Sequence, residues 1–155
     1  YVIRTSWLYG PVRQNFCLTM LRLHAAKASS GEVLRVVSDQ ISCPTSTRNL
    51  SLACWRFLFL EEYSKTSSIL HWSDAGVASW YDFAVAIGEL GVFHGLLKKS
   101  ALVQPITTKQ YPTPAKRPPY SLLDCSETID ILQIQQQHWK TALSDVLQQL
   151  RLRLA

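Results

Sequence analysis

Two clusters of polar side chains, each directly after an apolar run, hold the residues of this sequence that could do chemistry. Residues 4–7 (Arg-Thr-Ser-Trp) follow the apolar residues 1–3, and residues 38–40 (Ser-Asp-Gln) follow residues 33–37. Hydroxyl, guanidinium, carboxylate and amide groups can hydrogen-bond a polar ligand, and an exposed indole can stack on one. Ligands of an open α/β sheet bind beyond the carboxyl ends of its strands. We therefore expect both clusters to line a binding crevice.

The sequence holds no complete catalytic motif. It has no Tyr-x-x-x-Lys pair, no G-x-S-x-G elbow, no P-loop and no H-E-x-x-H helix. Tyr111 and Lys116 are five residues apart in a proline-rich segment, which does not suit a proton relay on one helix. Gly88, Gly91 and Gly95 end a helical pattern instead of following a strand, so they indicate a helix exit and not a phosphate loop. We predict a binding surface without catalytic residues.

Cysteines and histidines are dispersed along the chain and do not predict a metal site. The four cysteines lack C-x-x-C spacing and lie mostly among apolar residues, and the four histidines are equally scattered. Thiols in such surroundings are typical of reduced core cysteines. We expect four free cysteines and no metal.

The elements that must position the polar clusters alternate between strands and helices. Short apolar runs bounded by turn residues predict strands at residues 1–6, 33–37 and 69–72. Apolar residues at helical spacing predict four helices. The first runs from Asn15 to Ala28. The other three begin at a cap formed by Thr45 or Ser46, at a capping box formed by Ser79 and Asp82, and at Trp139. This order predicts an α/β fold with parallel strands joined by helices, in which the C-terminal edge of the sheet is the working edge.

Residues 103–120 differ from the rest because they contain five prolines among basic and aromatic residues. Proline fixes φ and removes a hydrogen-bond donor, so this segment cannot form a regular helix or an inner strand. We predict a stiff loop.

Composition indicates one globular domain. The chain has 155 residues, of which 47% are hydrophobic and 17% charged, a balance unlike that of disordered chains. Its net charge is +5, but the sixteen Lys and Arg are scattered instead of forming the stripe of a nucleic-acid binder. No apolar run approaches the roughly 20 residues that span a bilayer, and no signal peptide is visible, so we expect a cytoplasmic protein.

Five segments together resemble a known family. "RTSWLYG", "NFCLTMLRL", "LRVVSDQISCPTS", "SWYDFAVAI" and "PITTKQYPTPAKRPPYSLLD" are similar, in this order, to the C-terminal half of the dTDP-4-dehydrorhamnose reductases. These are extended-type short-chain dehydrogenases. The resemblance implies the C-terminal part of a Rossmann-like fold: residues 1–155 would hold its last strands and helices and the nucleotide-sugar-binding region. The N-terminal cofactor-binding half would be absent, which agrees with the lack of Met at position 1.

The family's activity is the NAD(P)H-dependent reduction of dTDP-4-dehydro-L-rhamnose to dTDP-L-rhamnose, used in cell-surface polysaccharides. The resemblance implies NADPH or NADH as cofactor and a dTDP-sugar as ligand, and it is compatible with a homodimer. In the family the glycine-rich loop and the Tyr-x-x-x-Lys pair belong to the N-terminal half. A chain without them is expected to be inactive alone.

By resemblance, nine residues would bind substrate: Thr5, Ser6, Trp7, Asn15, Asp39, Gln40, Pro44, Thr45 and Arg117. Three would border the cofactor: Arg4, Thr5 and Ser6. Trp7 would face the deoxysugar, Asn15 would donate to the sugar or diphosphate, and Arg117 would bind the diphosphate.

Each of these roles has a structural alternative. Trp7 suits a core position at a strand end, Asn15 a helix cap, and Arg117 an exposed basic loop. Turn and cap duties would explain Asp39, Gln40 and the Pro-Thr pair after Cys43 equally well. The residues after Ser79, including Trp80 and Tyr81, fit a capped and packed helix start better than a binding site.

Two other functions are compatible with the same residues. One is a different nucleotide-sugar dehydrogenase or epimerase of the class, and the other is a regulatory relative that binds a partner enzyme. The sequence also departs from the family before Asn15, where relatives often have a glycine and this chain has residues 11–14 without one. The direction of the Asn15 side chain is therefore open.

Overall fold

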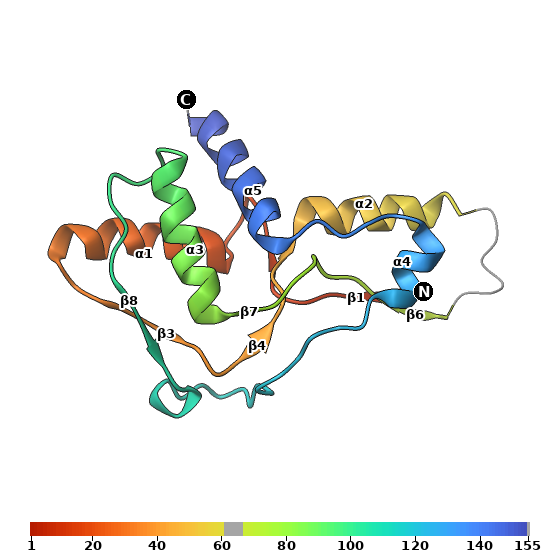
Figure 1. The fold of residues 1–155 in the computed structure, drawn as a ribbon, viewed down its shortest axis with the longest axis horizontal. Helices are drawn as coiled ribbons and strands as arrows, with labels where there is room; N and C mark the ends of the chain where they lie inside the picture. Colours follow the sequence, from red (N-terminus) through yellow and green to blue (C-terminus); the bar gives the residue numbers. More distant parts are fainter. Residues whose placement is uncertain (61–66, 155) are drawn as a thin grey trace.

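Strands occur in short pairs in the computed structural model, which describes residues 1–60 and 67–154. Three pairs are parallel: β1 (Val2–Arg4) with β6 (Ile69–His71), β2 (Leu8–Tyr9) with β5 (Thr45–Ser46), and β3 (Leu34–Val37) with β8 (Val103–Ile106). One pair, β4 (Ile41–Ser42) with β7 (Ala78–Ser79), is antiparallel. The predicted parallel pairing is confirmed. The prediction of one sheet holding β1 and β3 is wrong, because each of these strands packs on its own set of helices (Figure 1).

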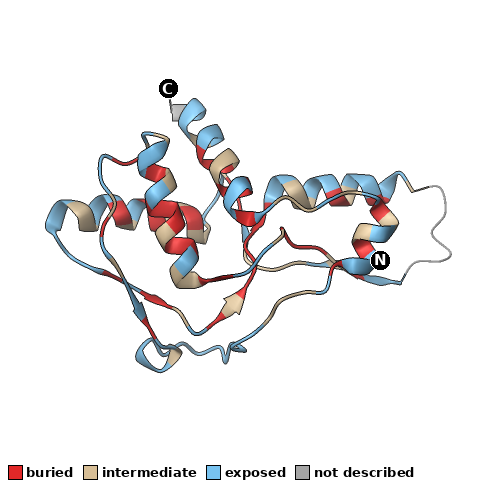
Figure 2. Cartoon of the chain, in the orientation of Figure 1, coloured by how far each residue is buried: buried red, intermediate tan, exposed pale blue. Residues whose placement is uncertain are grey.

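The larger core lies between the β3–β8 pair and three helices, α1 (Phe16–Ser30), α3 (Trp80–Phe93) and α5 (Trp139–Leu154). Figure 2 shows the buried faces of these helices turned toward one another. Phe83 and Ile87 of α3 and Leu143 and Leu147 of α5 are fully buried there. Burying one such side chain stabilises the fold by about 1.5–3 kcal/mol, so this helix packing supplies much of the stability of the region.

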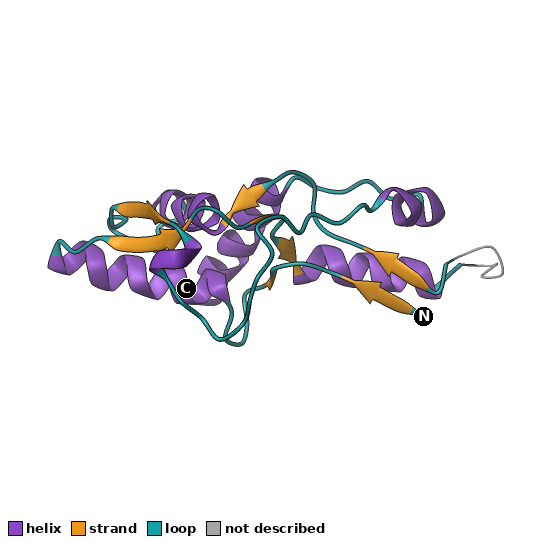
Figure 3. Ribbon diagram, turned by 90° about the horizontal axis from the view of Figure 1, so that it is seen from below, coloured by secondary structure: helices purple, strands orange, loops and turns teal. Residues whose placement is uncertain are grey.

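A second, smaller core lies under α2 (Thr47–Leu58) and α4 (Ser126–Leu132), against the β1–β6 pair. Figure 3 shows β1 and β6 side by side at the end of the molecule where the chain begins. Its buried residues are Ala53, Phe57, Leu70, Trp72 and Leu132. Helix α4 was not predicted from the sequence. Among the described residues, no helix is both long enough and apolar enough to cross a bilayer.

Helix starts agree with the sequence predictions. Ser79 and Asp82 form the predicted capping box at α3, with Asp82 N donating to Ser79 Oγ (3.0 Å) and Ser79 N donating to Asp82 Oδ2 (2.8 Å). Ser46, one of two candidates, caps α2 by accepting from Asn49 N (3.2 Å). Such caps satisfy N–H groups that have no partner within the helix.

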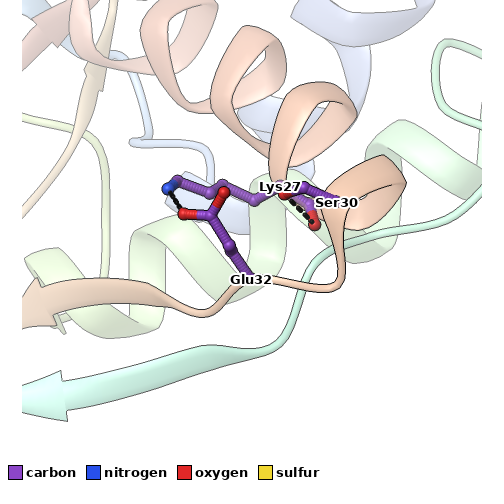
Figure 4. Close-up of polar contacts among 3 residues, drawn as sticks. All are labelled: Lys27, Ser30 and Glu32. Atoms are coloured by element: carbon purple, nitrogen blue, oxygen red, sulfur yellow. Dashed lines mark hydrogen bonds and ion pairs between the residues drawn. The ribbon is translucent and has the colours of Figure 1, made fainter.

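Helix α1 ends two residues later than predicted, at Ser30, with Gly31 in the left-handed conformation (φ 73°). Figure 4 shows how side chains close this end: Lys27 pairs with Glu32, and Ser30 Oγ donates to Lys27 O (3.3 Å). A cation in the last turn of a helix is favourable because the helix dipole is negative there.

Strand β8 corrects the prediction that all of residues 103–120 form a loop. Residues 103–106 pair with β3 in spite of Pro105, and a 3-10 helix, η1 (Thr108–Gln110), follows. Leu34 N donates to Leu102 O, and Ser38 N, directly after β3, donates to Ile106 O, so alternation along β8 turns the Pro105 nitrogen away from the partner strand. A proline is tolerated there because β8 is an edge strand.

His24 and Gly88 join α1 to α3 at close range. His24 is fully buried, and its Nδ1 accepts from Ala101 N (3.2 Å), so the proton sits on Nε2, which donates to Ala84 O (2.9 Å). Burial lowers the pKa of His24. A Cβ on Gly88 would lie 2.6 Å from His24 Cε1, so this position requires glycine for packing. Gly95, with φ 70°, follows the helix end, in line with the predicted helix exit.

Buried Asp74 connects the two cores. Its carboxylate accepts from Ser46 N and Asn49 Nδ2, both at 2.9 Å, while its carbonyl accepts from Cys43 Sγ (2.9 Å). Burial raises the pKa of Asp74 to about 6, against these two hydrogen bonds that lower it. The predicted free cysteines are confirmed, and burial raises the pKa of Cys17 and Cys43 to about 12. Both thiols therefore stay protonated near neutral pH.

Candidate functional site

Trp7, directly beyond β1, has a strained backbone and a stacked side chain. Its φ of 42° lies in the left-handed region, which costs a bulky residue about 1–2 kcal/mol. Its indole stacks on that of Trp80, with ring centroids 3.6 Å apart and planes 14° apart. The ring of Phe16 packs on Trp80 as well, with centroids 4.6 Å apart. Trp7 is half-buried. Strain of this kind at an aromatic residue is kept where the surroundings enforce it, and it marks candidate ligand sites.

The predicted residues around Ser6 and Thr45 come together next to Trp7. Ser6 Oγ donates to Cys43 O (2.7 Å), and Thr45 N donates to Trp7 O (3.3 Å). Pro44 and Thr45 are buried. Two chain segments nearly 40 residues apart are thus joined at the side chain of Ser6 and the backbone of Trp7.

Two of the predicted site residues carry hydroxyl groups with unmet hydrogen-bonding capacity. Thr5 Oγ1 and Thr45 Oγ1 are buried and have no hydrogen-bond partner among the described residues. A buried polar atom without a partner costs roughly 1–3 kcal/mol. Thr45 is fully buried, so only Thr5, which is half-buried, holds its hydroxyl near the surface, where a ligand could supply the missing partner.

Asp39 and Gln40 make hydrogen bonds within the protein. Thr108 donates to Asp39 Oδ1 through both its N (2.8 Å) and its Oγ1 (2.7 Å). These bonds lower the pKa of Asp39. Gln40 accepts from Trp80 Nε1 and donates to Thr108 Oγ1, both at 3.1 Å. Gln40 therefore connects Trp80 to Thr108 of η1, and Asp39 is bonded to the same threonine.

Asn15 is the helix cap that the sequence offered as an alternative. Its Oδ1 accepts from Leu18 N (3.1 Å), and its Nδ2 donates to Gly10 O (2.9 Å) and Arg13 O (3.0 Å). Arg13 has φ 59° in this turn, within the segment where the sequence resemblance led us to expect a glycine. The amide of Asn15 is thus used to hold the turn between β2 and α1.

Arg4 and Arg117 do not join this group of side chains. Arg4 is exposed at the end of β1, and Arg117 lies in the exposed loop of residues 111–120. That loop is tied to the rest of the protein by Ile41 N, which donates to Pro119 O (2.8 Å). Arg117 is therefore held near β4 by a short backbone tether.

Neither a hollow beside α1 and α3 nor any cluster of metal-ligating side chains in the described residues extends the group of residues around Trp7. The hollow, of about 500 Å³, lies between the end of α1, α3 and the start of β8, and its lining includes Lys27, Tyr81 and Lys99 but neither Trp7 nor Trp80. No group of three or more metal-ligating side chains occurs in the described part of the chain.

Two residues of the site were missed from the sequence. Trp80 was assigned to helix packing, and Thr108 had no assignment. Trp80 is the first residue of α3, and nothing in its spacing reveals that it meets Trp7 across 73 positions. Thr108 lies in the segment predicted as a stiff proline-rich loop, and its partner Asp39 is 69 positions earlier, so its bonds to Asp39 had no local signal.

Comparison with known proteins identifies the family. The model of the RmlD substrate binding domain matches residues 1–152. A spore coat polysaccharide biosynthesis protein, SpsK of Bacillus subtilis, is 40% identical over 148 residues, which cover 96% of this chain and 47% of that protein.

Solved structures agree. The crystal structure of a dTDP-4-dehydrorhamnose reductase from Clostridium acetobutylicum is similar with a TM-score of 0.80 and 34% identity, over 97% of this chain and 49% of that one. The reductase from Bacillus anthracis in complex with NADP has a TM-score of 0.74 and 30% identity, over 93% and 46%. The chain spans about half the length of the relatives it matches. It belongs to the RmlD substrate binding domain family.

Proposed function

We propose that this chain is the substrate-binding half of a dTDP-4-dehydrorhamnose reductase. The observation that carries the proposal is Trp7, which is held in a strained backbone conformation beyond β1 and stacked on Trp80 at 3.6 Å. The similarity to two reductases of that name over about half of their length supports it. Residues 1–155 then form one unit, and a cofactor-binding half lies outside this sequence.

In this proposal Trp7 is the platform for the sugar. A 6-deoxyhexose has an apolar methyl group and C–H edges, which pack well on a flat indole. Trp80 covers one face of Trp7, so the sugar uses what remains accessible of the half-buried ring. Thr45, which is fully buried, would support the wall of the site, and Thr5 would border the cofactor. Arg117, which can bind phosphate oxygens bidentately, would hold the diphosphate.

The residues present fit a nicotinamide cofactor at one edge. Thr5 Oγ1, at the end of β1, is a buried hydroxyl without a partner and suits the carboxamide of a nicotinamide. The cofactor, when bound, supplies the hydride that reduces C4 of the keto sugar. This chain holds the sugar and excludes water, while the tyrosine that protonates the oxygen comes from the other half. We propose a cytoplasmic location with this activity, and no turnover by the chain alone.

Calorimetric titration of the purified chain tests the proposal. We expect binding of dTDP-L-rhamnose that is tighter than binding of dTDP, because only the former places a sugar on Trp7. UDP-glucuronic acid should bind more weakly than dTDP-L-rhamnose. Equal binding of the UDP-sugar would favour a different nucleotide-sugar enzyme, and absence of nucleotide-sugar binding would overturn the proposal. Oxidation of NADPH by the chain alone with the keto sugar would show that the catalytic residues are misplaced.

A further inference from the structure

A directed chain of hydrogen bonds leads from Trp80 to Asp39. Trp80 Nε1 donates to Gln40 Oε1 (3.1 Å), Gln40 Nε2 donates to Thr108 Oγ1 (3.1 Å), and Thr108 Oγ1 donates to Asp39 Oδ1 (2.7 Å). An indole N–H can only donate and a carboxylate can only accept. The two ends therefore set the direction of every bond between them, and the amide of Gln40 has one allowed orientation.

This chain joins segments that would contact two different parts of one ligand. Trp80 backs Trp7, whose ring would face the sugar. Thr108 begins η1, which leads directly into the loop of residues 111–120 that carries Arg117. Gln40 lies between them and is only 7% exposed, so water does not readily replace its bonds.

We propose that Gln40 is a positioning residue that couples the Trp7–Trp80 stack to the start of the loop bearing Arg117. The ligand side of this inference rests on the proposed function. Because Gln40 bonds both Trp80 and Thr108, the position of the Trp7–Trp80 stack, which would hold the sugar, depends on the position of the loop bearing Arg117, which would hold the diphosphate. Loss of the Thr108 hydroxyl would free the Gln40 amide and, through it, loosen Trp80.

The first test needs no ligand. Indole N–H signals of ¹⁵N-labelled chain are followed by NMR in Thr108→Val and Thr108→Ser. We expect Thr108→Val to shift the Trp7 and Trp80 signals and to speed hydrogen exchange of the Trp80 indole, while Thr108→Ser, which keeps the hydroxyl, resembles the unchanged protein. The signals of Trp72 and Trp139, which lie in the two cores, should stay in place.

A matched control is Thr113→Val, because the Thr113 hydroxyl donates within the same loop to Ala115 O (3.1 Å). It should leave all indole signals unchanged. If the Trp7 and Trp80 signals of Thr108→Val equal those of the unchanged protein, or move no more than those of Trp72 and Trp139, the coupling does not exist.

The second test uses dTDP-L-rhamnose. We expect Thr108→Val to weaken its binding by about two- to tenfold, the change that one net hydrogen bond corresponds to, with a smaller effect on dTDP. Thr108→Ser and Thr113→Val should bind as the unchanged protein does. Equal loss for dTDP and dTDP-L-rhamnose would contradict coupling to the sugar platform. If the unchanged chain binds no dTDP-sugar, the proposed function fails, and the indole signals still decide whether Gln40 couples the two segments.

Discussion

The buried carboxyl of Asp74 contributes stability that we expect to be lost as the pH rises through the range between 4 and 6. Burial raises the folded-state pKa of this carboxyl from 3.8 to about 6. Between these two values the folded state binds more protons than the unfolded state, so the free energy of unfolding falls as the pH rises. The stability is fully present below the unfolded pKa and is lost as the pH passes the folded one.

The magnitude follows from the two pKa values. One pKa unit corresponds to about 1.4 kcal/mol, so full ionisation of Asp74 removes about 3 kcal/mol from the free energy of unfolding, of which about 2.4 kcal/mol falls between pH 4 and pH 7. His24 works in the opposite direction, because burial lowers its pKa and its protonation in the unfolded state weakens the fold at acid pH. A comparison of two proteins is therefore needed to isolate Asp74.

Urea unfolding of the unchanged protein and Asp74→Asn, followed at pH 4, 5, 6 and 7, makes this comparison. Asparagine has nearly the same shape but does not titrate, so other groups cancel in the difference between the two free energies. The free energy of unfolding of Asp74→Asn, taken relative to that of the unchanged protein, should rise by about 2.4 kcal/mol from pH 4 to pH 7. A difference that is the same at every pH would refute the claim that Asp74 is held in a buried site that disfavours its charge.

Two further substitutions test the packing and the strain. Gly88→Ala should lower the free energy of unfolding by about 1–3 kcal/mol, because its Cβ would meet His24 Cε1 at 2.6 Å; unchanged urea unfolding would mean that His24 can move. Arg13→Gly should raise the same free energy by about 1 kcal/mol, since φ is 59° at Arg13 and glycine adopts this conformation without strain. Arg13→Ala, which keeps the strain, should change little, and a destabilised Arg13→Gly would contradict the assigned strain.

Capping residues next to apolar helical patterns were sufficient to predict most helix starts from the sequence. Ser79 and Asp82 are three residues apart, the spacing that a capping box requires, and the structure contains that box. Ser46 and Asn15 cap α2 and α1 for the same reason, as polar residues directly before an apolar helical pattern. In each case the residues that interact lie within one helical turn, so the sequence pattern carries the contact itself.

Long-range pairing could not be predicted in the same way. β8 has only four residues and includes Pro105, and its partner β3 lies almost 70 positions earlier. The stack of Trp7 on Trp80 and the bonds of Gln40 to Trp80 and Thr108 also join distant segments. Contacts of this kind depend on how helices pack, so the polar residues after β1 and β3 indicated a site but not which side chains complete it.

Trp7→Ala shows whether the sugar of the ligand rests on this indole. The quantity to measure by calorimetry is the difference in binding free energy between dTDP-L-rhamnose and dTDP, which isolates the contribution of the sugar. We predict that this difference shrinks by about 1–3 kcal/mol in Trp7→Ala, from the apolar area that the indole no longer buries. Trp55→Ala, which removes an exposed indole of α2, should leave it unchanged. An unchanged difference in Trp7→Ala would contradict the account, because the sugar would not rest on Trp7.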